Sequence, residues 1–253
     1  MPGLVECSIS QSSPSMDSSR RQFLGQSFAL AASLKLPKLM PHLVLLGDSI
    51  FDNGSYTGGG PDVIAQVRGH LPAGWKATLL AQDGAVTDNI PSQLARLPQD
   101  ATHLVLSVGG NDALRQSGIL DMTARSSAQV LDMLAEIARN FSLRYKQVVD
   151  ACLMTRRPLT ICTIYNGNFA DKQYQQRAST ALTTFNDVII QTAVERQLTV
   201  IELRQIINRP ADYANPIEPS SQGGEKLART IVRLAADSQS PTLGARIIGL
   251  PLK

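Results

Sequence analysis

The sequence of 253 residues has few cysteines and histidines, little net charge and no long apolar stretch, and each of these features excludes a class of protein. It contains three cysteines and three histidines, carries a formal net charge of only +3, and has no stretch approaching the roughly 20 apolar residues that cross a bilayer. We therefore expect no membrane span. Because the net charge is small and the lysines and arginines are scattered, the sequence shows no basic patch for nucleic acid. Nucleic acid is therefore not an expected partner. The dispersed histidines lack the close spacing of metal ligands, so neither a metal nor a cofactor is expected.

The cysteines do not make a disulfide framework. Cys7, Cys152 and Cys162 are odd in number and cannot all pair within one chain. Cys162 lies inside the apolar run 159–164, where a small buried thiol is expected. A bridge between Cys152 and Cys162 stays open only if the protein reaches an oxidising compartment.

Residues 1–39 differ in character from the rest of the chain. They are rich in serine at first and then place Arg20 and Arg21 before a short apolar run, an order that resembles a twin-arginine export signal. This pattern predicts a signal peptide and a periplasmic or exported protein. The alternatives are a disordered leader, or a cytoplasmic protein whose true start is Met40. In each case we set the leader aside and expect one domain over residues 40–253.

From Met40 onward, short apolar runs alternate with segments of helical period, which predicts an α/β fold with a parallel sheet covered on both faces. The tail from residue 237 has no strong period and is expected to be irregular coil. The expected strands are 42–47, 76–81, 103–109, 159–165 and 198–203, and the expected helices are 61–71, 90–97, 126–155, 174–196 and 219–235.

Three loops at the carboxyl ends of these strands carry groups suited to chemistry, because ligands of open parallel sheets bind there. The first strand ends in Gly-Asp-Ser, which can place the Ser49 hydroxyl on a sharp turn. Gly84 follows the second strand and lets a backbone N–H approach a ligand closely. Two glycines after the third strand precede Asn111, whose side-chain amide can face the same cleft. Each motif alone is also ordinary turn chemistry.

Together and in this order, these loops resemble those of the SGNH (GDSL-type) esterase and lipase family, over about residues 40–235. The resemblance implies a flavodoxin-like three-layer α/β/α domain with a five-stranded parallel sheet. It also implies metal-free hydrolysis of small-molecule esters with Ser49 as the nucleophile. By the same resemblance, the oxyanion hole consists of the backbone N–H groups of Ser49 and Gly84 and the side chain of Asn111.

The sequence departs from the family in its last block. The family usually carries Asp-x-x-His shortly before the final helix, whereas this chain has Asn215 and Glu218 at those positions. No histidine is well placed as a substitute. His42 and His103 begin strands, at the edge of the sheet away from the cleft, and His70 lies in the first helix. All three are expected to be structural.

Two interpretations of Glu218 follow. In the first it replaces histidine as the general base for Ser49, with burial raising its pKa from an ordinary value of about 4.3. Asn215 would then donate an amide hydrogen bond to the carboxylate, where an aspartate would repel it. In the second interpretation Glu218 only interacts with the positive end of the last helix. The protein would then be a weak or inactive hydrolase that binds an acylated sugar or a lipid.

Other polar residues near the strand ends have supporting roles in this prediction. Asp48 and Asp52 are expected to brace the serine loop by accepting backbone hydrogen bonds, and Asp212 is an alternative acidic partner. Four glycines in residues 54–60 predict a flexible segment that moves over the site. The residues expected to line or shape the cleft are Asn53, Asp112, Tyr165, Asn166 and Asn168.

Overall fold

The computed structural model describes residues 40–237 and 245–249. The predicted leader with its arginine pair, and Cys7 within it, lie outside the described residues. Among the described residues, no helix is both long and apolar enough to cross a membrane.

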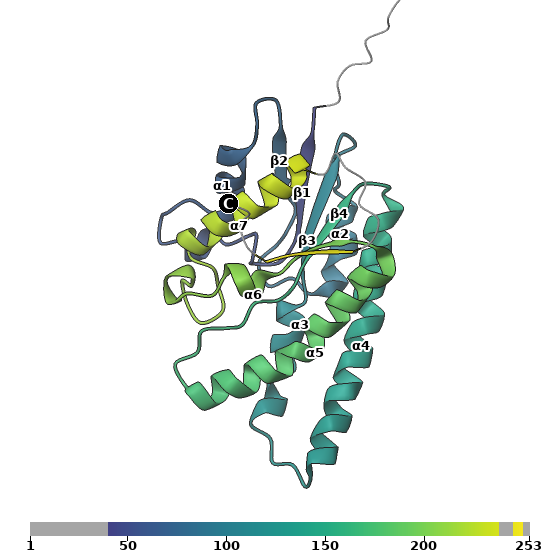
Figure 1. Ribbon diagram of the computed structural model, residues 1–253, viewed down its shortest axis with the longest axis vertical. Coiled ribbons are helices and arrows are strands. Elements are labelled where there is room, and N and C mark those ends of the chain that lie inside the picture. The colour runs from purple at the N-terminus through teal and green to yellow at the C-terminus, as the bar shows by residue number, and fades with distance from the viewer. Residues whose placement is uncertain (1–39, 238–244, 250–253) are drawn as a thin grey trace, which may run out of the picture. The chain divides into compact units, whose positions relative to one another are not determined.

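The described domain is built on one sheet of six parallel strands in the order β2-β1-β3-β4-β5-β6 (Figure 1). The first five strands follow the flavodoxin-like order, in which the chain reverses direction across the sheet beside β1. The strands are β1 His42–Gly47, β2 Lys76–Leu79, β3 His103–Ser107, β4 Leu159–Cys162, β5 Thr199–Ile201 and β6 Arg246–Ile248.

Helices cover both faces of this sheet, which confirms the predicted three-layer α/β/α arrangement (Figure 1). Helices α1 and α7 pack on one face, and α2, α4 and α5 pack on the other. The α-helices are α1 Val63–His70, α2 Ile90–Leu94, α3 Gly110–Leu114, α4 Ser127–Met154, α5 Lys172–Arg196, α6 Leu203–Ile206 and α7 Ser221–Asp237. Short 3-10 turns lie at η1 Gly54–Tyr56, η2 Thr87–Asn89, η3 Ser117–Leu120 and η4 Pro210–Asp212.

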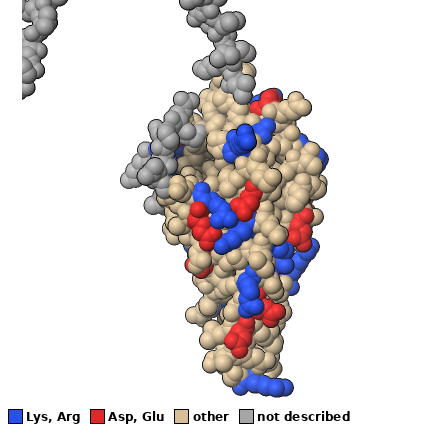
Figure 2. Space-filling view, turned by 90° about the vertical axis from the view of Figure 1, so that its right-hand side faces the viewer, with Lys and Arg blue, Asp and Glu red and all other residues tan. Residues whose placement is uncertain are grey.

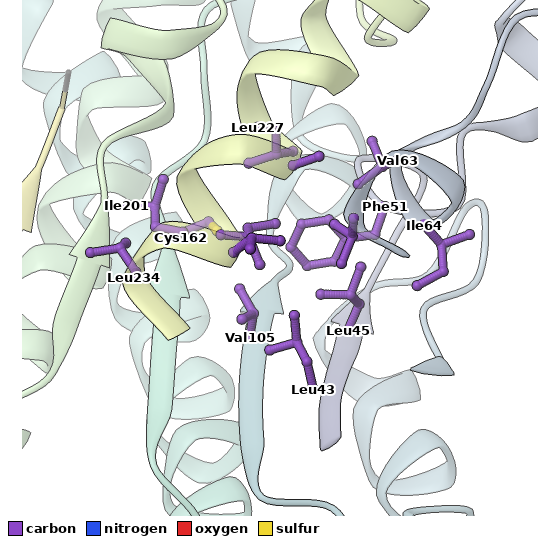
Figure 3. Close-up of a cluster of buried hydrophobic side chains, with 14 of the residues drawn as sticks. Leu43, Leu45, Phe51, Val63, Ile64, Val105, Cys162, Ile201, Leu227 and Leu234 are labelled. Atoms are coloured by element: carbon purple, nitrogen blue, oxygen red, sulfur yellow. The ribbon is translucent and has the colours of Figure 1, made fainter. Parts of the chain in front are cut away.

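Strand β1 shows why its sequence is apolar without interruption. Leu43 and Leu45 point into the core layer beneath α1 and α7 (Figure 3), whereas Val44 and Leu46 point into the layer beneath α4 and α5. All four side chains are fully buried. Because successive side chains of a strand point to opposite faces, a strand covered on both faces must be apolar at every position.

The two described cysteines lie in different core layers. Cys162 packs beneath α7, and Cys152 packs on the opposite side of the sheet, so the two do not form a bridge. Both are free and buried, as the apolar sequence around Cys162 predicts. Burial raises the pKa of the Cys152 thiol to about 12 and raises that of Cys162 well above its ordinary value. Thiols held in this protonated form are chemically inert.

The prediction of five strands and a coiled tail was wrong at residues 246–248. This segment pairs in parallel with β5, and the backbone N–H of Glu202 donates to the carbonyl of Ile248 at 2.7 Å. Its side chains are only partly covered, and Ile247 is 54% exposed. Such an edge strand is held by backbone hydrogen bonds to a distant segment, and its three residues are too few to show the alternation or length of a strand.

The three histidines have partners away from Ser49. His42 contacts Asp100 at 2.9 Å through Nδ1, and His70 contacts Glu225 at 2.8 Å through Nε2. His103 stacks on the ring of Trp75 with 5.6 Å between ring centroids. None of these contacts supplies an imidazole to the serine.

The turn that carries the serine depends on the absence of a side chain at Gly47. This residue has a φ of +139°, and a Cβ built there would lie 1.9 Å from the carbonyl oxygen of Ser107 on β3. We expect Gly47→Ala to lower the free energy of unfolding by on the order of 3 kcal/mol or more, measured by urea denaturation. Gly69→Ala is the control, because that glycine lies in α1 with open space around it and should change stability by less than about 1 kcal/mol. Equal effects at the two positions would contradict this explanation.

Candidate active site

Ser49 lies in the turn directly after β1, at the carboxyl edge of the sheet. The side chain of Gln93, fully buried on α2, fixes the start of this turn by making two hydrogen bonds to the backbone of Gly47, at 2.7 and 2.8 Å. The next backbone N–H, that of Asp48, donates to the carbonyl of Ser107 on β3 at 3.2 Å. The chain then turns sharply and leaves Ser49 only 6% exposed. The position of the serine is thus set by the sheet itself.

The Ser49 hydroxyl donates to the Glu218 carboxylate, with 3.1 Å between Oγ and Oε1. These residues are 169 positions apart in the sequence, and the fold brings them together. Glu218 is itself 6% exposed and lies shortly before α7. A hydroxyl in contact with a buried carboxylate has the geometry of a nucleophile and its base.

The segment that presents Glu218, residues 213–220, is shaped by Asn215. The side-chain Oδ1 of Asn215 accepts the backbone N–H groups of Ile217 and Glu218, both at 2.9 Å. This is the turn that an asparagine forms with the backbone two and three residues ahead. The expected hydrogen bond from the Asn215 amide to the Glu218 carboxylate was therefore wrong. In the described structure Asn215 acts on the backbone of Glu218, and its side chain is exposed.

Further hydrogen bonds hold the same segment from the residues that follow β4 and from the serine loop. The Tyr165 hydroxyl donates to the carbonyl of Ile217 at 2.5 Å, and the backbone N–H of Asn168 donates to Pro216 at 2.8 Å. The fully buried amide of Asn53 donates to the carbonyl of Pro219 at 3.1 Å. Asn53 thus ties the serine loop to the Glu218 segment. The prediction that Asn53 lines the cleft was wrong. Its side chain is fully buried, and buried polar atoms form hydrogen bonds within the protein.

The surroundings of Glu218 make its carboxylate more basic than usual. Burial raises the pKa of Glu218, the negative charge of Asp83 adds to the rise, and the hydrogen bond from Ser49 opposes it. The second oxygen, Oε2, is buried and has no hydrogen-bond partner among the described residues. A carboxylate that loses water and gains only one donor holds a proton more readily.

Asp48 is a second buried carboxyl group beside the serine. Its Oδ1 accepts the backbone N–H of Ile50 at 3.1 Å, in the bracing role that its position predicted. Burial raises the pKa of Asp48 from 3.8 to about 8, and the charges of Glu218 and Asp112 add to the effect, although the Ile50 hydrogen bond opposes it. Asp48 therefore carries a proton at neutral pH, and Glu218 is the carboxylate in contact with Ser49.

Asp212 belongs to a different cluster. It is fully buried and accepts the backbone N–H groups of Asn208 and Arg209, at 3.0 and 2.9 Å, and the Lys226 ammonium at 2.7 Å. Burial alone would raise the pKa of Asp212, but Lys226 and the two N–H donors outweigh it and hold the pKa below its usual value. Asp212 stabilises the chain ahead of α7 and does not contact Ser49 or the Glu218 carboxylate.

The residues expected to form the oxyanion hole follow β1, β2 and β3, which are neighbours in the sheet. Gly84 follows β2 with a φ of +75°, and the Asn111 side chain donates to the carbonyl of the neighbouring Ala85 at 3.0 Å. An amide group has two N–H donors, so one remains for a ligand. Asn111 also lines the same cavity as Ser49. The role of this group as an oxyanion hole stays a prediction.

The serine loop is joined to the Gly84 loop by Asp52 and Tyr56. Asp52 accepts the backbone N–H of Asp83 at 2.9 Å, as its predicted bracing role requires, and the Tyr56 hydroxyl donates to the Asp83 carboxylate at 2.7 Å. Within residues 54–60, Thr57 donates to the carbonyl of Gly60 at 2.7 Å. Motion of this segment over the site stays a prediction.

A cavity of about 120 Å³ opens from Ser49 and Glu218 and passes between α4 and α5. Sequence reasoning missed its lining, most of which comes from α3, η3, α4 and α5. Of the residues expected to line the cleft, Tyr165 does so, whereas Asp112, Asn166 and Asn168 do not. Asp112 instead accepts the backbone N–H and the hydroxyl of Thr87, at 3.0 and 2.7 Å. In the part of the chain that the structure describes, no group of three or more histidine, cysteine or acidic side chains is arranged to hold a metal ion.

Comparisons with known proteins show the family and the fold of the chain. A family model described as the GDSL-like lipase/acylhydrolase family matches residues 45–226. An extracellular lipase from Streptomyces rimosus is 16% identical, with a TM-score of 0.57 over 79% of this chain and 100% of the lipase. An acetylxylan esterase from Geobacillus stearothermophilus is 19% identical, with a TM-score of 0.54 over 77% of this chain and 94% of the esterase. At these identities the two structures show a shared fold. No curated protein matches the sequence significantly.

The protonated state of Asp48 has a measurable consequence for stability. Its pKa is about 8 in the folded protein and close to 3.8 when unfolded, so folding retains a proton that the unfolded chain releases. The stabilisation is fully present below pH 4 and is lost as the pH rises to 8. We expect the melting temperature of Asp48→Asn minus that of the wild type to grow between pH 4 and 8 and then level off. A difference that is constant with pH would contradict the assignment.

Because Asn215 acts as a hydrogen-bond acceptor, its replacement by alanine and by aspartate should change stability to different extents. Asn215→Ala removes the acceptor of two backbone N–H groups and is expected to lower the free energy of unfolding by about 1 kcal/mol. Asn215→Asp keeps an oxygen in the same place and should retain most of that stability. Urea denaturation of both variants measures the difference. Equal losses of stability in the two variants would contradict the role of Asn215 as an acceptor.

Proposed function

Because the chain belongs to the GDSL-like lipase/acylhydrolase family, we propose that it is a serine ester hydrolase in which Glu218 replaces histidine as the general base. The observation that carries this proposal is the 3.1 Å hydrogen bond from the Ser49 hydroxyl to Glu218 within a buried site. The match of the family model supports the broad reaction class. The proposed roles of the individual residues rest on their positions in the site.

In the first half of the reaction, the Ser49 Oγ attacks the ester carbonyl carbon while its proton passes to Glu218 Oε1. The carbonyl oxygen becomes an oxyanion, which the backbone N–H groups of Ser49 and Gly84 and the Asn111 amide would stabilise. Losing one such donor typically costs about 10²–10³ in rate. The intermediate then expels the alcohol oxygen, which takes the proton from Glu218, and the acyl group stays on Ser49.

In the second half, water replaces the alcohol and gives a proton to Glu218 as it attacks the acyl-enzyme. Collapse of that intermediate returns the proton to the Ser49 Oγ and releases the carboxylic acid. Glu218 alternates between base and acid in each half, which requires a pKa nearer the working pH than that of an exposed glutamate. The burial that raises the pKa of Glu218 supplies this change.

A glutamate base does not need the aspartate that normally orients a histidine and stabilises its charged form. Glu218 becomes neutral when it takes the proton, so an acidic partner would only oppose its ionisation before the reaction. The structure has Asn215 in this place, fixing the backbone of Glu218 without adding charge. This chemical consistency between the two positions favours catalysis over a loss of function.

The experiment measures covalent labelling by a fluorophosphonate and hydrolysis of p-nitrophenyl acetate from pH 4 to 9 on the full chain. We expect wild-type activity to rise with pH as Glu218 loses its proton, at a higher pH than an exposed glutamate does, because burial raises the pKa of Glu218. Ser49→Ala should abolish both signals. Glu218→Gln should lower kcat by about 10²-fold or more, because general base catalysis contributes that much.

Glu136→Gln is the matched control, since Glu136 is exposed on α4 and lies outside the site. It should leave labelling and turnover unchanged. The second candidate function is a binding protein that lacks an activated serine, and the missing partner of Glu218 Oε2 is the observation that favours it. A folded wild-type protein that neither labels nor turns over would decide for that function.

A further inference from the structure

The wall of the cavity is mostly apolar. Among the described residues that line it, Asp48 and Glu218 are the only acidic or basic ones; Asp48 directly precedes Ser49 and Glu218 accepts the Ser49 hydroxyl. The apolar side chains of the wall include Leu120, Leu134, Ile137, Ala178, Leu182 and Phe185. A surface of this kind favours hydrocarbon over a sugar, because buried hydroxyl groups need hydrogen-bond partners.

The shape of the cavity follows from the length of two helices. Helix α4 has 28 residues and α5 has 25, and both continue beyond the carboxyl edge of the sheet, where they diverge toward their N-terminal ends (Figure 1). Ion pairs of 2.9 Å hold α4 to α5 at the other end, between Arg196 and Asp150 and between Lys146 and Glu195. Arg177 on α5 pairs with Asp121, directly after η3, also at 2.9 Å. These ion pairs help to fix the positions of the two helices on either side of the cavity.

We propose that this cavity binds the acyl chain of the substrate, so that the protein acts on esters of medium-chain fatty acids in preference to acetate esters. The inference rests on the proposed function, because it places the chain next to Ser49. Phe185 and Ala178, which both line the cavity, lie seven positions apart on α5, or about 10 Å along the helix, the length of an extended chain of about eight carbons.

The order of events explains why the acyl chain occupies the cavity and not the alcohol. The alcohol must leave before water can attack, and water must reach the same atom from solvent. The acyl group stays attached to Ser49 throughout. The apolar space between α4 and α5 suits the group that remains, while the alcohol and water exchange with solvent.

The first test varies the acyl chain with a constant leaving group. Each methylene that becomes buried should raise kcat/KM of p-nitrophenyl esters about fourfold until the cavity is full, so octanoate should exceed acetate by at least tenfold. Acetate esters of increasingly long alcohols should show no such rise. An enzyme that is active but has a flat or falling acyl series would overturn the inference while leaving the proposed function intact.

The second test narrows the cavity. Ala181→Leu adds three carbons to a side chain that lines the cavity and should lower the octanoate-to-acetate ratio of kcat/KM by about tenfold. Thr183→Leu is the control, since Thr183 lies on the same helix but is exposed and does not line the cavity. Its ratio should match the wild type. Melting temperatures show whether each variant folds, and an unchanged ratio in folded Ala181→Leu would overturn the inference.

The third test does not depend on turnover. Decan-2-one and butan-2-one are neutral ketones that differ only in chain length, and their binding to Ser49→Ala is measured by calorimetry. We expect decan-2-one to bind at least tenfold more tightly, and Ala181→Leu to remove most of that advantage. If no ester is hydrolysed but this difference is found, the proposed function fails and the cavity remains a site for an apolar chain. Equal binding of both ketones would overturn the inference.

Discussion

The arrangement of this site depends on a buried carboxylate that has one hydrogen-bond donor, the hydroxyl of Ser49. Within the described residues no cation or second donor satisfies the other oxygen of Glu218. Removing a carboxylate from water is costly unless it is paired, so the surrounding structure must hold it there. The hydrogen bonds from Tyr165, Asn53 and Asn168 to the backbone of residues 213–220 do so. They come from the segments that follow β1 and β4, and together they fix a side chain that its own interactions would not retain.

The stability of the rest of the fold comes from regions that do not bear the cost of burying a carboxylate. Apolar strands buried on both faces, and helices packed on each side, provide a framework whose rigidity positions the loops. On the face shown in Figure 2, acidic and basic side chains are mixed rather than separated. The charges that matter for chemistry are thus the few inside the site, where water does not screen them.

The sequence was sufficient for the features that depend on local pattern. Continuous apolar runs marked the first five strands, and the residues that follow β1, β2 and β3 do lie at one edge of the sheet. It was insufficient where geometry depends on distant partners. Strand β6 is defined by hydrogen bonds to β5, Asn53 by its contact with Pro219, and the cavity by the angle between α4 and α5. The length of α4 and α5 was the one available signal for that cavity.

At Asn215 the structure differs from the predicted contact. The family usually carries an aspartate at this position, so the asparagine indicated a change of charge beside Glu218. That conclusion follows from the chemistry of the two side chains alone. Which of the two ends of an asparagine side chain is used depends on backbone angles that residue types do not specify. The structure uses the oxygen, and so the residue acts through the shape of a turn.

The absence of any lysine, arginine or histidine from the described lining of the cavity also bears on what happens after hydrolysis. Ester hydrolysis turns a neutral substrate into an acid, which ionises in water. A newly formed anion would lie beside Glu218 with no positive charge to hold it. Like-charge repulsion would then drive the product out of the cavity, so the carboxylate that we propose as the base would also clear the site for the next substrate.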